Sequence, residues 1–311
     1  MRALLVVNPK ATTTSERARN VLVRALRTEM EIRVCETKRR GHAAEMAGQA
    51  ARDGLDVVVA LGGDGTVNEV INGLFAAAPG ARQDELPALA VVPGGSTNVF
   101  ARALGLPGEA IEATGALLEA VHARRTRTVS LGRAEGRYFT FCAGFGLDAE
   151  VVRKVERARL RGKVSTPRLY VRSTLTQFLL DTQRRDQPIT LERPGEEPDP
   201  GLATVIVQNT TPWTYLGGRA INPCPEAGFD SGLDLLAIRT LHVPATTLVF
   251  ANLLTGRRPG RHERQSYTLH DLSDFTLSAS RPLAFQLDGE YLGERTKVSF
   301  CAMPNAVRVF C

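Results

Sequence analysis

Val57-Val58-Val59-Ala60-Leu61-Gly62-Gly63-Asp64-Gly65-Thr66-Val67-Asn68-Glu69 joins a short apolar run to a glycine-rich loop. An unbroken apolar run is typical of a strand buried on both faces, as in a parallel sheet. The glycines that follow permit a tight turn and a close approach of the backbone to a ligand. A helical pattern continues over residues 67–77, and the N–H groups that open a helix bind anions. This stretch therefore predicts a strand, a phosphate-binding loop and a helix.

The same alternation of strand and helix is repeated on both sides of this stretch. Apolar runs typical of strands lie at residues 3–7, 32–35, 57–61 and 89–92, and helical patterns lie at 15–27, 43–51, 67–77 and 111–123. Strands spaced by helices indicate βαβ units, in which helices cover both faces of a parallel sheet. Residues 1–128 are therefore expected to form an α/β domain with a doubly wound, mostly parallel sheet.

After Thr128 the pattern changes to strands separated by turns. Strand-like runs lie at residues 138–142, 203–207, 233–238, 275–278, 283–287 and 298–301, with helices expected at 169–180 and 246–254 and a polar loop at 193–201. Short strands at this spacing, separated by turns, favour an antiparallel sandwich or barrel. We expect residues 129–311 to form a larger β-rich domain, whose last residues can pack back on the first domain.

The composition narrows the classes of function. The 311 residues are 43% hydrophobic and 23% charged, as in a globular protein, and no apolar run is long enough to span a bilayer. The run 4–7 ends at Asn8-Pro9-Lys10, which indicates a buried strand rather than a signal peptide. Five scattered cysteines without a CxxC pair speak against a disulfide framework or a zinc site and fit a reducing cytoplasm.

Polar loops follow three of the predicted parallel strands, at residues 8–12, 62–69 and 93–98. Because the carboxyl ends of parallel strands meet at one edge of a sheet, where open α/β sheets bind ligands, we expect the loops to converge. Thr66 and Thr97 can donate hydroxyl groups to a phosphate, and Asp64 can bind magnesium or a water bound to it.

One glycine-rich loop of this kind is often only a turn, and two common nucleotide motifs are missing. No Gly-Lys-Ser/Thr follows the loop, so it is not a Walker A motif, and GxGxxG is absent from the first βα turn. The second absence speaks against a hydride-transferring dinucleotide enzyme. The convergence of three polar loops favours a phosphate site over simple turns.

The ordered set of motifs resembles the catalytic domain shared by diacylglycerol, sphingosine and ceramide kinases, and most closely the soluble bacterial lipid kinases of that superfamily. The motifs are Asn8-Pro9, Thr37, residues 62–69, Pro93-Gly94-Gly95-Ser96-Thr97-Asn98-Val99-Phe100-Ala101-Arg102, Asn209, Gly217-Gly218, Pro225-Glu226-Ala227, Thr255-Gly256 and Leu287-Asp288-Gly289-Glu290. Gly-Gly-Asp-Gly-Thr alone is shared with NAD kinases. The ordered set is specific and covers almost the whole chain.

The resemblance implies that ATP and Mg²⁺ are cofactors and that the active site lies in a cleft between the two domains. It also implies that the general base is one of the two carboxylates of Asp288-Gly289-Glu290, without indicating which one. Asp64 is the third catalytic candidate. From the residues alone, Asp288-Gly289 is a strong hairpin-turn signal. The nucleotide-site candidates are Asn8, Pro9, Lys10, Ala11, Thr12, Thr37, Gly62, Gly63, Asp64, Gly65, Thr66, Val67, Asn68, Glu69, Gly95, Ser96, Thr97 and Asn98.

The sequence departs from the family pattern where members of the family bind a structural magnesium at an Asp-Asp-Gly segment. Here Ser231 stands at the expected ligand position, with Gly228 and Leu233 as the neighbouring ligand candidates. A hydroxyl is a poorer magnesium ligand than a carboxylate, so we expect a weakened site. The third loop has Gly-Gly-Ser-Thr-Asn where many members have Gly-Thr-x-Asn, but Thr97 and Asn98 are retained.

Basic residues are concentrated between Arg153 and Arg172, a segment that contains eight arginines and lysines and one acidic residue, Glu156. At about 1 kcal/mol for each basic residue near an anionic membrane, such a segment favours reversible attachment to phospholipid. Nucleic acid is a weaker candidate because Tyr170 is the one aromatic residue in the segment. The membrane-contact candidates are Arg153, Lys154, Arg157, Arg159, Arg161 and Lys163, and a second basic group is Arg257, Arg258, Arg261 and Arg264.

We therefore expect a cytoplasmic, ATP-dependent lipid kinase that associates peripherally with the inner face of the membrane. Phosphorylation of diacylglycerol to phosphatidic acid is the first candidate reaction. An NAD kinase-like or other soluble-substrate kinase is the alternative, and a nucleotide- or lipid-binding protein without turnover is a third hypothesis. The sequence does not name the acceptor lipid, and it leaves the oligomeric state open, with a homodimer as one option.

Overall fold

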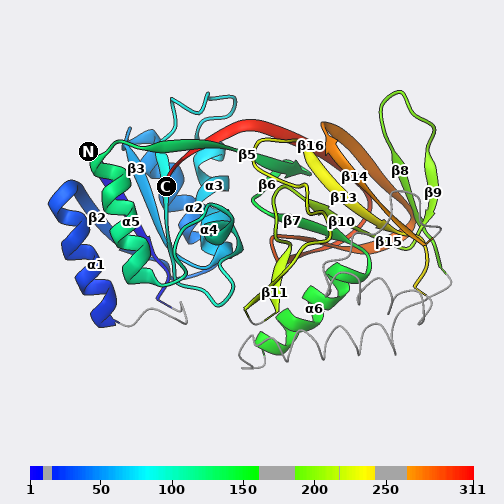
Figure 1. Ribbon diagram of the computed structural model, residues 1–311, viewed down its shortest axis with the longest axis horizontal. Helices are drawn as coiled ribbons and strands as arrows, with labels where there is room; N and C mark the ends of the chain where they lie inside the picture. The colour runs from blue at the N-terminus through cyan, green and yellow to red at the C-terminus, as the bar shows by residue number, and fades with distance from the viewer. Residues whose placement is uncertain (10–15, 161–185, 217, 242–264) are drawn as a thin grey trace. The chain divides into compact units, whose positions relative to one another are not determined.

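The computed structural model describes residues 1–9, 16–160, 186–216, 218–241 and 265–311 (Figure 1). The chain forms two compact units. The first contains Met1–Leu131 and Pro304–Cys311, and the second contains Gly132–Met303. The expected boundary after residue 128 falls within strand β5 (Thr126–Ala134), which runs from the first unit into the second. Strand β16 (Glu290–Phe310) carries the chain back to the first unit.

The first unit is built on a parallel sheet in the order β4-β3-β1-β2. Its strands are β1 (Arg2–Val7), β2 (Glu31–Glu36), β3 (Val57–Gly62) and β4 (Ala88–Pro93). Every residue of β3 and β4 is buried, because both strands lie inside the sheet with helices on both faces. The end of β16 extends this sheet beside β4, where Val309 pairs with Leu89 in parallel.

The helices of the first unit cover the two faces of this sheet (Figure 1). They are α1 (Glu16–Glu29), α2 (His42–Arg52), α3 (Asp64–Ala77), α4 (Val99–Ala103) and α5 (Ala110–His122). Alternate side chains of β3, at Val57, Val59 and Leu61, share one core with α1 and α5. Helices α2 and α3 pack against each other, and α2 contacts β1. The doubly wound α/β expectation is confirmed.

The second unit is dominated by an antiparallel sheet whose strands run in the order β14-β13-β10-β7-β15-β16. These strands are β7 (Cys142–Phe145), β10 (Thr204–Gln208), β13 (Leu233–Ile238), β14 (Ser266–Leu272), β15 (Asp274–Leu287) and the first part of β16. The short strands β6 (Arg137–Phe139), β8 (Ile189–Glu192), β9 (Asp199–Leu202), β11 (Thr214–Leu216) and β12 (Arg219–Ile221) complete the unit, together with α6 (Leu147–Leu160). The expectation of a β-rich antiparallel region is confirmed.

Two local expectations for this unit differ from the structure. The strand expected at 138–142 is broken into β6 and β7, because the backbone N–H groups of Thr140 and Phe141 donate to the Asp288 carboxylate instead of a neighbouring strand. The polar loop expected at 193–201 contains part of β9, which pairs with β8. Helix α6 was not predicted. The helices expected at 169–180 and 246–254 lie outside the described residues.

Within the part of the chain that the structure describes, no helix is both long enough and apolar enough to cross a membrane.

Candidate active site

The predicted nucleotide loops of the first unit end neighbouring strands. Asn8 follows β1, Thr37 follows β2, Gly63 follows β3 and Gly94 follows β4. Since the strands are parallel in the order β4-β3-β1-β2, these residues lie at the same edge of the sheet. The structure thus brings the described members of the predicted set to one edge, as open α/β sheets do with ligand-binding loops.

Close backbone packing explains most of the glycines in these loops. The Gly94 N–H donates to the Gly62 carbonyl at 2.8 Å. A Cβ atom on Gly95 would lie 2.7 Å from the Gly63 Cα atom, and one on Gly62 would lie 2.5 Å from the Thr66 Oγ1 atom. Real Cβ atoms do not approach other atoms so closely, so side chains are excluded here. The close packing of Gly62 on Thr66 and of Gly95 on Gly63 therefore requires glycine at these positions.

Gly65 differs from its neighbours because the space beside it is open. Nothing lies within 4 Å of the position that a Cβ atom on Gly65 would occupy. Gly65 is exposed in the first turn of α3, where the Thr66 N–H closes the first turn on the Gly63 carbonyl at 2.9 Å. Open space at the N-terminus of a long helix fits a phosphate group, whose charge the helix dipole stabilises.

Polar side chains of the loops are held by one another. The Asn8 Nδ2 atom donates to the Thr66 Oγ1 atom at 3.2 Å. Asn98 has a φ of 47° and makes two hydrogen bonds with Gly95, accepting from its N–H at 2.9 Å and donating to its carbonyl at 2.8 Å. Asn68 is buried and accepts from Asn72. These contacts hold the loops to one another and to the start of α3.

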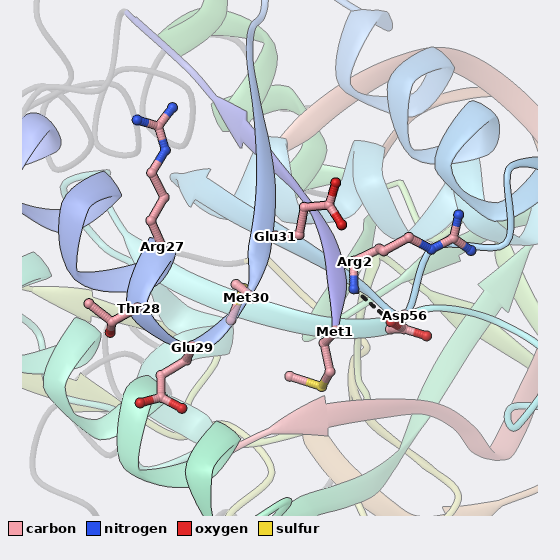
Figure 2. Close-up of a pocket in the computed structure, with 8 residues that line it drawn as sticks. All are labelled: Met1, Arg2, Arg27, Thr28, Glu29, Met30, Glu31 and Asp56. Atoms are coloured by element: carbon pink, nitrogen blue, oxygen red, sulfur yellow. Dashed lines mark hydrogen bonds between the residues drawn. The ribbon is translucent and has the colours of Figure 1, made fainter.

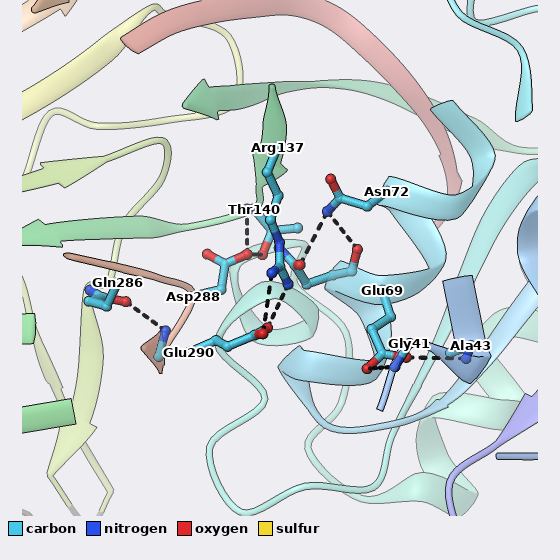
Figure 3. A network of polar contacts seen from close by, with 11 residues as sticks. Gly41, Ala43, Glu69, Asn72, Arg137, Thr140, Gln286, Asp288 and Glu290 are labelled. Carbon is cyan, nitrogen blue, oxygen red and sulfur yellow. Dashed lines mark hydrogen bonds and ion pairs between the residues drawn. The ribbon is translucent and has the colours of Figure 1, made fainter. Parts of the chain in front are cut away.

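Asp64 and Glu69 accept backbone N–H groups at the start of helices other than their own. The Asp64 carboxylate accepts from Val99 and Phe100, each at 3.1 Å, at the start of α4. Glu69 accepts from Gly41 at 2.9 Å and from Ala43 at 3.1 Å, at the start of α2 (Figure 3). A carboxylate at a helix N-terminus is favoured by the helix dipole. Both acids therefore hold the loop edge together.

The remaining nucleotide-site candidates fall into three groups. Pro9, Thr37, Ser96 and Thr97 lie at the loop edge with exposed or half-buried side chains. Val67 is buried, so its side chain serves the core. Lys10, Ala11 and Thr12 lie outside the described residues.

In the second unit, Asp288-Gly289 forms the turn between β15 and β16. Both residues have positive φ, 47° and 76°, and they separate the paired residues Leu287 and Glu290, as in a two-residue type I′ hairpin. The turn expected from the residues alone is therefore present. The two carboxylates predicted to be catalytic, Asp288 and Glu290, are only two residues apart in the chain, but their surroundings differ.

Asp288 is buried and saturated with hydrogen bonds. Its carboxylate accepts four, from the Thr140 N–H and hydroxyl at 2.7 and 2.8 Å and from the N–H groups of Phe141 and Cys142 at 3.0 and 3.1 Å (Figure 3). Burial raises the pKa of Asp288, and the three backbone hydrogen bonds oppose this rise. The arrangement joins the turn to the break between β6 and β7.

Glu290 is more accessible and is held by a cation. Its carboxylate receives both terminal nitrogens of Arg137, at 3.2 and 2.5 Å, and its side chain is 19% exposed (Figure 3). A two-point arginine–carboxylate pair fixes the orientation of the carboxylate. Arg137 and Thr140 were missed by the sequence reasoning, because nothing in the sequence marks a partner about 150 residues away from the turn.

Gly228, Ser231 and Leu233, the candidate ligands of a weakened structural magnesium site, lie at the start of β13 and in the turn before it. The Ser231 hydroxyl donates to the Gly228 carbonyl at 3.1 Å, so it is directed at a predicted ligand instead of a cation. Leu233 begins the buried strand β13. No cluster of three or more His, Cys, Asp or Glu side chains is found among the described residues, and magnesium favours carboxylate oxygens.

The basic candidates on α6 are not equivalent. Arg153 pairs with Glu150 and with Glu294 at 3.2 Å and lies over the Tyr291 ring at 5.8 Å, so it is engaged within its own unit. Lys154 is half-buried and Arg157 is exposed. The side chain of Arg159 and all of Arg161 and Lys163, like the second basic group at 257–264, lie outside the described residues.

A hollow of about 470 Å³ lies at the opposite edge of the first unit's sheet from the loops (Figure 2). It is lined by residues at the amino ends of β1 and β2, including Arg2 and Glu31, and by Asp56 just before β3. Because ligands of open α/β sheets bind at the carboxyl ends of the strands, this hollow is not part of the candidate site.

Comparisons with known proteins agree with the motifs. Residues 2–134 match the family model of the diacylglycerol kinase catalytic domain. A diacylglycerol kinase of Bacillus subtilis (strain 168) is 29% identical over 256 residues, covering 81% of this chain and 77% of the relative. A diacylglycerol kinase of Staphylococcus aureus (strain MRSA252) is 26% identical over 315 residues, covering 99% and 92%.

The solved structures show the same fold. The crystal structure of a diacylglycerol kinase from Bacillus anthracis (strain Sterne) aligns with a TM-score of 0.72 at 20% identity, covering 99% of this chain and 96% of the other. Another structure from that strain aligns with a TM-score of 0.78 at 23% identity. Residues 2–134 thus match the diacylglycerol kinase catalytic domain, and the chain is similar to diacylglycerol kinases over most of its length, which supports a kinase that transfers phosphate to a hydroxyl group.

Proposed function

We propose that this protein is an ATP-dependent lipid kinase that phosphorylates a hydroxyl of a membrane lipid, with diacylglycerol as the first candidate acceptor and phosphatidic acid as the product. The observation that carries this proposal is the extent of the likeness. Relatives named diacylglycerol kinase align over as much as 99% of the chain, well beyond the catalytic domain at 2–134. The aligned region therefore includes the second unit and its Asp288–Glu290 turn.

The first unit is the nucleotide-binding domain in this proposal. The open space beside Gly65 and the N-terminus of α3 support a phosphate site, and Asn8, Thr37 and Thr97 lie at the same edge. Magnesium would neutralise phosphate charge during transfer. Asp64, whose carboxylate lies at this edge and accepts N–H groups at the start of α4, would be the residue to hold it, because magnesium favours carboxylate oxygens.

The second unit is the lipid-substrate domain, and Glu290 is the general base. A base must reach the acceptor hydroxyl, and phosphoryl transfer requires little more than positioning and removal of its proton. Glu290 is partly exposed and oriented by Arg137. Asp288 is buried, and each of its oxygens already accepts two hydrogen bonds, which suits a residue that positions the turn.

Peripheral attachment to the cytoplasmic face of the membrane completes the proposal. Arg157 is exposed on α6, and Lys154 is beside it in the helix with a half-buried side chain. Each basic residue near an anionic surface contributes about 1 kcal/mol, so the attachment is reversible. Arg153 contributes less, because its charge is already paired with Glu150 and Glu294.

The direct test measures transfer of labelled γ-phosphate from ATP, with magnesium, to diacylglycerol, phosphatidylglycerol, a sphingoid base and NAD. The lipids are presented in mixed micelles. We expect one lipid to be labelled and NAD to remain unlabelled. Labelled NAD without labelled lipid would favour a soluble-substrate kinase, and ATP binding without any transfer would favour a binding protein without turnover.

A further inference from the structure

A chain of hydrogen bonds runs from the first turn of α6 to the turn that carries Glu290. The Asp148 Oδ2 atom accepts from the Gln286 Nε2 atom at 2.7 Å. The Gln286 Oε1 atom accepts from the Gly289 N–H at 2.8 Å (Figure 3). Gln286 is 1% exposed, and all these groups belong to the second unit. The chain thus ends at the residue between the two carboxylates predicted to be catalytic.

The backbone beside this chain leaves room for it. Gln286 of β15 is paired with Gly144 of β7. A Cβ atom on Gly144 would lie 2.0 Å from the Asp148 Oδ2 atom and 2.9 Å from the Gln286 Nε2 atom. A side chain at residue 144 would therefore displace both groups. The glycine allows the carboxylate to reach Gln286 across the surface of the sheet.

We propose that Asp148, acting through Gln286, is a positioning residue for the Asp288-Gly289-Glu290 turn and so for Glu290. The effect on catalysis rests on the proposed function, in which Glu290 is the general base. The hydrogen bond from the Gly289 N–H to Gln286 is independent of that function.

The chemistry of the amide explains why an acid is needed at the far end. Gln286 can accept from the Gly289 N–H only with its oxygen, which turns its NH₂ group towards Asp148. An ionised carboxylate is an acceptor only, so it permits this orientation alone. A protonated carboxyl can also donate, and the reversed amide would then satisfy Asp148 at the expense of the Gly289 contact. Ionised Asp148 therefore fixes the turn.

The surroundings of Asp148 make its ionisation sensitive to pH near neutrality. Burial raises the pKa of Asp148 to about 6, and the hydrogen bond from Gln286 opposes this rise. Helix α6 packs on β7, β10 and β15. Strand β10 has no ionisable side chain, β7 has the Cys142 thiol, and residues 285–287 of β15 have none. On α6 itself, Glu150 and Arg153 are paired with each other.

The first test follows the Gly289 amide by NMR while the pH is changed from 5 to 8 in apo protein. We expect the chemical shift of this amide to titrate with a midpoint of about 6 in the wild type and to lose this transition in Asp148→Asn. Asparagine keeps an acceptor for Gln286 but does not titrate. A Gly289 amide that does not respond near pH 6, or that responds equally in Asp148→Asn, would overturn the inference.

The second test compares Gln286→Leu with Gln208→Leu. Gln208 is a matched control: it is buried in β10, donates to the Thr210 carbonyl at 3.0 Å and accepts from the Cys224 N–H at 2.9 Å. At a temperature where both variants are folded, we expect Gln286→Leu to lower kcat by about tenfold or more, with KM for ATP within about twofold, because small misplacements of a base are costly. Gln208→Leu should keep the wild-type kcat.

The two tests separate this inference from the proposed function. Equal kcat values for Gln286→Leu and Gln208→Leu in an active enzyme would show that the Gln286 contact does not position the base. A wild type that labels no lipid would contradict the proposed function, and the Gly289 titration would still decide whether Asp148 controls the turn.

Discussion

Asp148 is expected to reduce the stability of the folded protein at neutral pH. Its pKa is raised from 3.8 to about 6 by burial, so the folded state binds a proton more tightly than the unfolded state does. At 1.36 kcal/mol per pKa unit, ionised Asp148 costs about 2 to 3 kcal/mol of folding free energy above pH 6. This cost is absent below about pH 4, where both states are protonated.

Asp148→Asn should therefore raise Tm at pH 8 and leave it nearly unchanged at pH 4. Thermal unfolding of both proteins across this pH range measures the effect. A difference in Tm that stays constant with pH would show that the carboxyl is not destabilised by burial. A stability cost that rises with pH is expected if Asp148 serves to position the turn rather than to stabilise the fold.

Asp288→Asn is expected to destabilise the second unit. Each carboxylate oxygen accepts from at least one backbone N–H, and an amide nitrogen in place of either oxygen would meet that N–H, which cannot accept a hydrogen bond. A buried donor left without an acceptor costs about 1 to 3 kcal/mol. Denaturant unfolding should show this loss, and an unchanged midpoint would mean that the turn does not depend on the carboxylate.

Motifs in the sequence singled out candidate site residues, but not the side chains that contact them. The resemblance singled out Asp64, Asp288 and Glu290, whereas Arg137, which orients Glu290, is an ordinary surface-type residue in the sequence. Gln286 and Asp148 meet across 138 residues of chain. Such contacts depend on sheet register, which a single sequence does not specify.

At the scale of elements, the packing of α2 on α3 depends on the absence of a side chain at Gly73. A Cβ atom there would lie 2.1 Å from the Ala44 carbonyl oxygen. Gly73→Ala should therefore destabilise the first unit by about 1 to 3 kcal/mol, because the helices must separate. Gly115 in α5 is the matched control, since nothing lies within 4 Å of its Cβ position.

Gly115→Ala should stabilise the protein by about 0.5 to 1 kcal/mol, the usual gain for alanine in a helix interior. Urea unfolding of the two variants against the wild type measures both effects. Loss of stability in both variants, or in neither, would contradict the packing argument.

Elements of the first unit were easier to predict than those of the second. Continuous apolar runs such as Val57–Leu61 can only be buried strands or helices, and the glycine loops after them mark their ends. In the second unit, Thr140 and Phe141 look like strand residues, but their N–H groups are used by Asp288. The strand break follows from a tertiary contact, which propensity does not detect.

At the scale of the whole molecule, the sequence pattern changes near Thr128 from alternating strands and helices to strands separated by turns. This change predicted two domains, and the chain forms two compact units. The sequence analysis allowed the last residues to pack back on the first domain, but it placed no strand after residue 301. Residues 304–311 belong to the first unit, where Val309 pairs with Leu89 and the Arg308 side chain donates to carbonyls near Leu86. Such a return of the chain is a property of topology rather than of local sequence.

Attachment of the protein to membranes should depend on the basic face of α6. Reversing Lys154 and Arg157 to glutamate is expected to weaken partitioning onto vesicles with anionic lipid by about tenfold or more at low salt, at about 1 kcal/mol for each charge. The same reversals at Arg24 and Arg27 on α1, both exposed, provide the control. Vesicle sedimentation measures binding, and equal binding of both double variants would contradict the assignment of the membrane face.

The most direct test of the central claim is the rate of γ-phosphate transfer from ATP to diacylglycerol in mixed micelles by the wild type and by Glu290→Gln. The wild type should form labelled phosphatidic acid. The Glu290→Gln variant should be slower by about 100-fold or more, since it loses the base but keeps a hydrogen-bonding partner for Arg137. Its binding of ATP should be unchanged. Transfer by Glu290→Gln at the wild-type rate would contradict the assignment of the base, and a wild type that labels no lipid would contradict the proposed function.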